Sequence, residues 1–257
     1  MTAPNGGTLF LGGSVHALRS VDYPLPSAYN RAFDASTRVA LEVEPHALST
    51  SGDALLKAGK YPGGDSLKNH VDPRTYDYLR RVFGLMKIPE AKFSRYRPWL
   101  LVLLLDTPSI RGLSDDLGVD QFITNRAKAN GKPVTGLESA SEHNTVFAGL
   151  TDRQSEALLL VSLIPQTSAS GRRPDVTEAW RRGDVETLAR ETHAAYSDFP
   201  AFGDRLLGAR NRQWLPKLEG FLKSGHTCFV VVGAAHLGGN DGLLALLRGR
   251  GFRVEQI

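Results

Sequence analysis

Short apolar runs that end in glycine-bearing turns recur along the chain, and they predict buried β-strands. The most continuous of them reads Cys-Phe-Val-Val-Val and is followed by Gly233. Uninterrupted apolar runs of this kind are typical of strands that are covered on both faces of a sheet. The predicted strands are Thr8–Leu11, Arg38–Val43, Pro133–Leu137, Thr227–Val232 and Phe252–Ile257.

Segments with apolar residues at helical spacing lie between these runs and predict helices. Ser27 is predicted to cap the first helix at its amino end, and the strongly apolar segment Pro89–Leu105 is predicted to be one helix in the core. Glycine, proline and polar residues predict loops over 59–73 and 168–174. The other predicted helices are Ser27–Phe33, Thr75–Gly84, Gly118–Gly131, Thr151–Leu163, Val176–His193, Asn211–Lys223 and Leu243–Arg248.

The two ends of the chain resemble each other. Thr8–Glu44 and Thr227–Ile257 each give a strand, a Gly-x-x-His turn, a helix and a second strand. Alternating strands and helices predict α/β layers, and an approximate internal repeat would let two halves meet in one sheet. No glycine-, serine- or proline-rich linker divides the chain. We therefore predict a single α/β domain over residues 1–257, with a central mixed β-sheet flanked by helices.

Composition narrows the class of protein. Hydrophobic residues make up 41% and charged residues 23%, as in ordinary globular proteins. The net charge of +4 is spread along the chain, whereas nucleic-acid binding usually requires a concentrated basic face. The apolar runs are far shorter than the roughly 20 residues that span a bilayer. We expect no nucleic-acid partner and no transmembrane segment.

Cys228 is the only cysteine, so an intramolecular disulfide is excluded. A single cysteine fits the cytoplasm, but many periplasmic proteins also lack disulfides. The first seven residues contain neither a basic nor an apolar stretch, so no signal peptide is present as written. We expect a cytoplasmic protein, or a periplasmic or secreted one if a leader has been removed.

His16 and His236 are the first candidates for chemistry. Each stands three residues after a glycine that follows an apolar strand, and this position places side chains at the carboxyl edge of a sheet, where α/β folds bind ligands. One Gly-x-x-His turn is a weak signal, and its histidine could simply pack or cap the turn. Two in matching context are more specific, and they predict a shared site.

Glutamates at the ends of predicted strands are the second candidates. Glu42 and Glu44 are two residues apart, so a strand would project both to the same face. Two close carboxylates repel each other unless they are solvated or a cation lies between them. Glu138 ends another predicted strand and could bring a third carboxylate, or it could be an ordinary loop residue. Imidazole with carboxylate is a ligand set for Zn²⁺, Mn²⁺, Fe²⁺ or Co²⁺.

Arg210 and Asn211 precede the predicted helix that contains Trp214. Asn211 could cap this helix, and Arg210 could be solvated or could stabilise an oxyanion on a substrate carbonyl. The remaining histidines lie outside any repeated context and are weaker candidates: His46, His70, His143, His193 and His226. Cys228 lies inside an apolar strand, where a thiol is usually inert.

These residues, in this order, resemble the TraB/GumN/Tiki family over nearly the whole chain. The resemblance rests on Leu9–His16, Pro24–Pro26, Leu41–Glu44 and Gly136–Glu138, on Arg210-Asn211 before Trp214, and on Val232–Gly239 with Gly242–Leu244. The family's hallmark is a pair of Gly-x-x-His motifs with a glutamate on the intervening strand. Two positions depart from its usual pattern, because Ser14 stands in place of threonine and Glu44 in place of aspartate.

The resemblance implies an α/β fold shared with erythromycin-esterase-like and ChaN-like proteins. It also implies a Mn²⁺- or Co²⁺-dependent protease, since animal members of the family cleave Wnt proteins near their amino ends; many bacterial members have no known substrate. In the resulting hypothesis, His16, Glu42 and His236 hold the metal. Glu44 or Glu138 acts as general base, and Arg210, beside Asn211, stabilises the oxyanion.

The predicted function is therefore divalent-metal-dependent hydrolysis of a peptide or protein substrate, with Mn²⁺ or Co²⁺ favoured and Zn²⁺ acceptable. Two alternatives share the fold. One is a non-catalytic protein of the ChaN-like type that uses the histidines to bind haem or another ligand, and the other is an esterase of small molecules. The sequence does not decide between these alternatives or give the oligomeric state.

Overall fold

The computed structural model describes residues 1, 7–105, 112–163 and 176–257. The predicted loop over 168–174 lies outside the described residues. The chain forms two compact units, the first from Met1–Pro45, Pro108–Ser139 and Ser168–Ile257, and the second from His46–Thr107 and Ala140–Thr167. The prediction of one domain over residues 1–257 stays a prediction.

The first unit is built around a parallel β-sheet. In the described residues it has four strands, β1 (Thr8–Ser14), β2 (Arg38–Val43), β3 (Val134–Glu138) and β4 (Thr227–Gly233), in the order β1-β4-β2-β3. Every neighbouring pair is parallel, so the predicted mixed sheet is wrong and the predicted α/β class is confirmed. Parallel pairing follows from the helical connections, because each successive strand is reached through a crossover.

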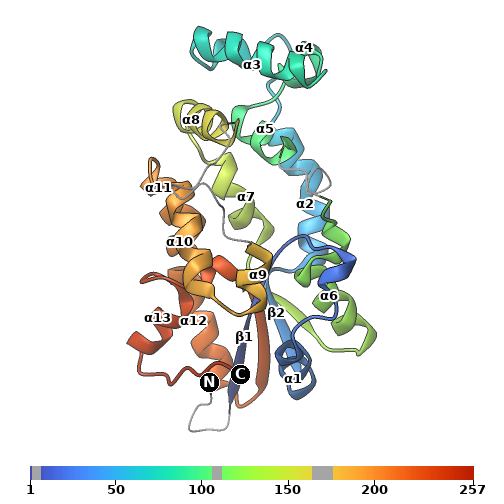
Figure 1. Cartoon of the computed structure of the whole chain (residues 1–257), viewed down its shortest axis with the longest axis vertical. Helices are drawn as coiled ribbons and strands as arrows, with labels where there is room; N and C mark the ends of the chain where they lie inside the picture. Colours follow the sequence, from blue (N-terminus) through green and yellow to red (C-terminus); the bar gives the residue numbers. More distant parts are fainter. Residues whose placement is uncertain (2–6, 106–111, 164–175) are drawn as a thin grey trace. The chain divides into compact units, whose positions relative to one another are not determined.

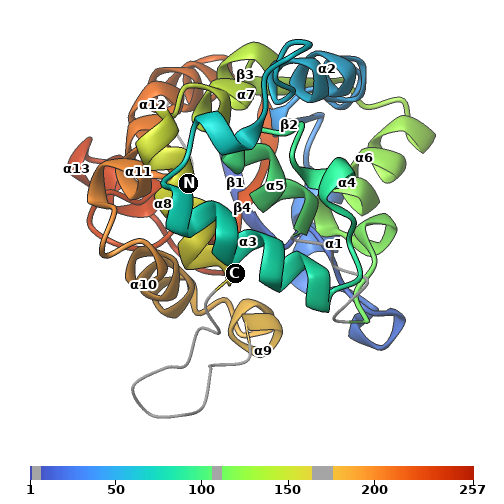
Figure 2. The ribbon, with the colours of Figure 1, turned by 90° about the horizontal axis from the view of Figure 1, so that it is seen from above.

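Helices cover both faces of this sheet (Figures 1 and 2). One face packs against α1 (Ser27–Ala35) and α6 (Val119–Ala129), and the other against α12 (Gly208–Lys223) and α13 (Leu243–Gly249). Successive side chains of a strand point to opposite faces. Along β2, Val39 and Leu41 therefore join the first core, and Ala40 joins the second.

The remaining elements of the first unit are shorter. Single-turn helices follow two strands, at Ser20–Asp22 after β1 and at Ala234–His236 (η5) directly after β4. A third, at Asp115–Leu117, precedes α6. The other helices of this unit are α9 (Val176–Arg181), α10 (Val185–Ala195) and α11 (Pro200–Leu206).

The second unit is helical. Its elements are α2 (Pro45–Ala58), the single turn Leu67–Asn69, α3 (Pro73–Leu85), α4 (Glu90–Phe93), α5 (Pro98–Leu105), α7 (Ala140–Ala148) and α8 (Asp152–Leu163). Its core includes Phe83, Phe93 and Leu159. The predicted single helix Pro89–Leu105 is wrong, since it is two helices. Proline disfavours a helical residue before it and tolerates a helix start, so Pro98 begins α5.

A cluster of charged side chains joins two segments of the second unit. His70 hydrogen-bonds with Asp65 through Nε2 at 2.7 Å and with Asp152 through Nδ1 at 2.8 Å. These two hydrogen bonds raise the pKa of His70 above its usual value. The hydrogen bond between His70 and Asp65 also lowers the pKa of Asp65 to about 2. Tyr61 stacks on the imidazole at a ring distance of 4.4 Å. The imidazolium thus ties the residues before α3 to the start of α8.

Two further expectations are settled by the described elements. Phe252–Ile257 pairs with no strand, so the predicted last strand is wrong, and the structure does not show the internal repeat. None of the helices in the described ranges has the length and apolar character required to cross a membrane.

Candidate functional site

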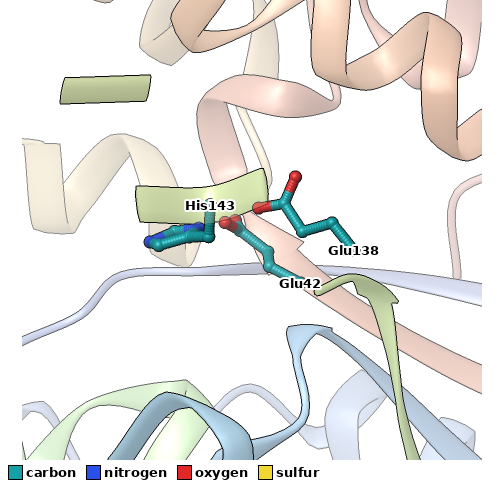
Figure 3. A group of neighbouring side chains, drawn as sticks. All are labelled: Glu42, Glu138 and His143. Atoms are coloured by element: carbon teal, nitrogen blue, oxygen red, sulfur yellow. The ribbon is translucent and has the colours of Figure 1, made fainter. Parts of the chain in front are cut away.

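Two buried carboxylates lie at the carboxyl ends of neighbouring strands. Glu42 is on β2 and Glu138 is the last residue of β3, and the parallel register pairs Val43 with Glu138. The side chains of Glu42 and Glu138 are 11% and 3% exposed, and a carboxylate oxygen of each lies within 4.8 Å of the other. Figure 3 shows the two carboxyl groups pointing toward one another. The structure therefore brings together the glutamates that the sequence placed at separate strand ends.

Arg210 lies between these carboxylates. Its Nη2 donates to Glu42 Oε2 and to Glu138 Oε1, both at 2.6 Å, and its Nε donates to Glu138 at 3.1 Å. The guanidinium carbon lies 4.7 Å from the ring of Trp214, four residues further along α12, whose Nε1 donates to Glu138 at 3.2 Å. Residues four apart on a helix share one face. Both Arg210 and Trp214 thus hold the carboxylate of Glu138 in place.

His236, in η5, completes this network. It is 4% exposed. Its Nε2 accepts from Arg210 Nη1 at 3.0 Å, and its Nδ1 donates to Asn211 Oδ1 at 2.7 Å. Burial lowers the pKa of His236 to about 4, so the ring is neutral with its proton on Nδ1. The Nε2 atom lies 3.8 Å from Glu42 Oε1.

The site is rich in carboxylate. Burial alone would raise the pKa of Glu42, but His236, Arg210 and the Gly233 N–H, which donates to Oε1 at 2.7 Å, keep it below its usual range. Glu138 accepts from Arg210 and Trp214 through both oxygens, as an ionised carboxylate does. Two buried carboxylates this close repel each other, so the site favours positive charge beside them.

Arg210 and Asn211 do not precede the helix, as the sequence analysis expected, but lie in its first turn, since α12 begins at Gly208 and its N-cap is Leu207. The alternative that Asn211 caps the helix is therefore wrong. All five N–H groups of Arg210 are engaged, the Nη1 group bonding with Leu206 O and His236. A role in stabilising an oxyanion requires Arg210 to release at least one of these bonds.

His16 differs from its sequence counterpart. Its side chain is 75% exposed, and its Nδ1 lies 3.0 Å from Asp120 Oδ2 on α6. This hydrogen bond raises the pKa of His16 to about 9, so the ring is protonated at neutral pH. Its role as a metal ligand stays a prediction.

Glu44 lies one residue beyond the end of β2 and is half-buried. Because Glu44 is outside the strand, the alternation of strand side chains does not determine where the Glu44 side chain points. The role of Glu44 as general base stays a prediction.

Sequence reasoning missed two contributors. The Gly233 amide and the Trp214 indole hold the carboxylates; the four-residue spacing from Arg210 to Trp214 was the available signal for the second. His143, one of the weaker candidates, belongs to α7 in the second unit. Within the first unit, Glu42, Glu138 and His236 offer two carboxylates and an imidazole, a donor set for a divalent cation.

Comparison with known proteins places these residues in context. Residues 2–256 match the model of the TraB/PrgY/gumN family. The chain is 23% identical over 256 residues to the uncharacterized protein YbaP of Escherichia coli (strain K12) and to that of Shigella flexneri, covering 96% of this chain and 90% of each relative. No solved structure gives a significant match. Because the family model spans nearly the whole chain, this protein belongs to the TraB/PrgY/GumN family.

Proposed function

We propose that this protein is a divalent-metal-dependent hydrolase that cleaves peptide bonds. The observation that carries the proposal is the buried pair Glu42 and Glu138, whose carboxylates meet at one edge of the sheet beside Arg210. Two buried like charges repel each other, and a divalent cation beside the carboxylates would offset this repulsion. The family's protease members support the choice of reaction.

The donor chemistry fits such a cation. Glu42 and Glu138 offer oxygens, and His236 is held neutral, with an Nε2 that accepts from Arg210 and lies 3.8 Å from Glu42 Oε1. His16 is a further candidate for a nitrogen ligand. Mn²⁺ and Co²⁺ accept mixed oxygen and nitrogen ligands. When bound, the cation would lower the pKa of its water and polarise a substrate carbonyl.

The chain's own residues have separate tasks in this proposal. Asn211 fixes the tautomer of His236, and Arg210 holds the carboxylates in register. Glu44, which is nearer to solvent than Glu42, is the candidate for accepting and releasing a proton.

Metal analysis coupled to an activity assay tests the proposal. The purified protein, treated with EDTA, is supplied with Mn²⁺, Co²⁺ or Zn²⁺ and incubated with a mixture of synthetic peptides, and cleavage is read by mass spectrometry. We expect chelation to abolish cleavage and Mn²⁺ or Co²⁺ to restore it. Full cleavage by metal-free protein would refute the proposal. An intense Soret band in the absorption spectrum would instead support the haem-binding alternative.

Substitutions assign the ligands. Glu42→Gln, Glu138→Gln, His16→Gln and His236→Gln are compared by metal stoichiometry, with the exposed His226→Gln as a matched control at the opposite end of β4. A ligand's loss should lower metal content, because an amide is a poorer ligand than carboxylate or imidazole. The control should retain metal.

The general base is assigned separately. Glu44→Gln should retain the metal and reduce the cleavage rate by roughly 10²–10⁴, the usual contribution of general base catalysis. Should Glu44→Gln lose the metal instead, Glu44 is a ligand. If it retains full turnover, Glu138 becomes the leading candidate for the base.

A further inference from the structure

Arg210 donates to each of the three atoms of the first unit that a metal ion would use. Its guanidinium bonds with Glu42 Oε2 and Glu138 Oε1 at 2.6 Å and with His236 Nε2 at 3.0 Å. A neutral imidazole has one lone pair on its acceptor nitrogen, so a metal ion on His236 Nε2 would have to displace Arg210 Nη1. A carboxylate oxygen can accept a hydrogen bond and bind a metal ion at once, but a guanidinium already placed between the carboxylates repels a second cation there.

The carboxylate pair needs a cation even without metal. Two buried like charges repel strongly in a low dielectric, and removal of their counter-charge destabilises the fold. Arg210 is 6% exposed and is always charged, so it supplies that cation from the chain itself. The planar fork of a guanidinium suits this task, because it can bond with two carboxylates at once.

The guanidinium also has a contact that does not depend on the carboxylates. It lies over the ring of Trp214 at 4.7 Å, within α12, and its Nη1 donates to the O atom of Leu206, the last residue of α11, at 3.1 Å. These interactions remain available if the bonds to Glu42 and Glu138 weaken. Arg210 can thus give up a carboxylate without losing its position on the helix.

We propose that Arg210 is a built-in counter-cation that competes with the metal for Glu42, Glu138 and His236. It preserves the arrangement of these three side chains in the metal-free protein, and it lowers the affinity of the site for a divalent cation. This inference rests on the proposed function, since it concerns the same site. Arg210 therefore keeps the three side chains in place when no metal is bound, and the site binds a divalent cation less tightly as a result.

Calorimetric titration of the chelator-treated protein with Mn²⁺ tests this inference, together with thermal unfolding with and without Mn²⁺. Arg210→Gln removes the charge but keeps a polar side chain, and Arg210→Lys keeps the charge without the fork. Arg212→Gln is the matched control, because Arg212 is on the same helix but exposed and paired with Asp204.

We expect Arg210→Gln to bind Mn²⁺ roughly tenfold more tightly than the unmodified protein or better, since a positive charge has left the site. Its metal-free form should unfold at a lower temperature, and Mn²⁺ should restore much of the difference. Arg210→Lys should lie between the two, and Arg212→Gln should behave as the unmodified protein.

Equal or weaker Mn²⁺ binding by Arg210→Gln would overturn the inference. If that variant does not fold without metal, Arg210→Lys provides the same comparison, and binding no tighter than that of the unmodified protein would again overturn it. Mn²⁺ binding by the unmodified protein with no gain in the variants refutes only this inference. If Arg210→Gln binds Mn²⁺ and the unmodified protein does not, the inference is supported and the proposed function is refuted. If neither protein binds Mn²⁺, the inference and the proposed function are both refuted.

Discussion

Replacing Asn211 by leucine should reveal how much of the fold's stability depends on orienting His236. Asn211 is 1% exposed. Its Oδ1 accepts from His236 Nδ1 at 2.7 Å, and its Nδ2 donates to His236 O at 3.3 Å and to Asp241 O at 2.9 Å. Leucine has a similar volume but no polar group, and it leaves no space for a water molecule to replace the amide.

The magnitude follows from the groups left unpaired. The imidazole N–H and two backbone carbonyls lose their partner, and each buried unsatisfied group costs about 1–3 kcal/mol. The longer bond to His236 O is the weakest of the three, so its loss costs least. We expect Asn211→Leu to lower the free energy of unfolding by about 3 kcal/mol.

Urea denaturation followed by circular dichroism measures this change, with the slope of the transition expected to stay constant. Asn125→Leu is the control, since Asn125 is exposed on α6 and bonds only with the side chain of Gln121 among the contacts of the described residues. Its unfolding free energy should change by about 0.5 kcal/mol or less. A similarly small change for Asn211→Leu would refute the reasoning.

A second variant tests the electrostatic part of the same contact. Asn211→Asp places a carboxylate against the Nδ1–H of His236, and an adjacent negative charge favours imidazolium. The pKa of His236, which burial lowers to about 4, should therefore rise. Titration of the ring by NMR measures it, and an unchanged or lower pKa would contradict the assigned tautomer.

Four further variants concern other parts of the chain. A Cβ at Gly118 would lie 2.2 Å from His16 O, so Gly118→Ala should destabilise the protein by about 1–3 kcal/mol in urea. Gly52→Ala, where α2 leaves open space, should instead stabilise it by up to about 1 kcal/mol. The raised pKa of His70 contributes stability that is fully present below its unfolded value of 6.5 and is lost as pH rises through the folded pKa; His70→Gln should remove this loss in thermal melts across pH 6–9, and an unchanged profile would contradict it. Ser155→Ala leaves the backbone N–H at the start of α5 unpaired, since Ser155 Oγ accepts it at 2.7 Å, and should cost about 1–3 kcal/mol in urea, whereas no loss would show that the bond is dispensable.

The strands were predictable because their signal is local. Arg38–Val43 is confirmed residue for residue as β2, and Thr227–Val232 lies within β4. A strand buried on both faces has a nearly continuous apolar sequence, which few other structures share. Phe252–Ile257 failed because a strand also needs a partner edge, and the apolar pattern of a segment does not say whether one exists.

The glutamates of the site were also accessible from sequence, since each is one of the last two residues of a strand and parallel strands end at one edge. Arg210 was placed outside its helix, and its bonds with Glu42 and Glu138 span 168 and 72 residues. Contacts over such separations depend on how α12 packs on the sheet. No pattern within α12 states which strand its first turn will face.

The matched Gly-x-x-His motifs show what a local pattern does and does not determine. In both cases the glycine is one of the last two residues of a strand, and the parallel register sets Ser14 opposite Gly233. His236 is nevertheless buried in η5 against Asn211, and His16 lies exposed beside Asp120. Their pKa values consequently move in opposite directions, because burial disfavours the charged ring and a carboxylate favours it. A metal ligand must be a neutral imidazole. His236 meets that requirement at neutral pH as the chain stands, whereas His16 meets it only by giving up the proton that Asp120 stabilises, so equal motifs do not imply equal roles.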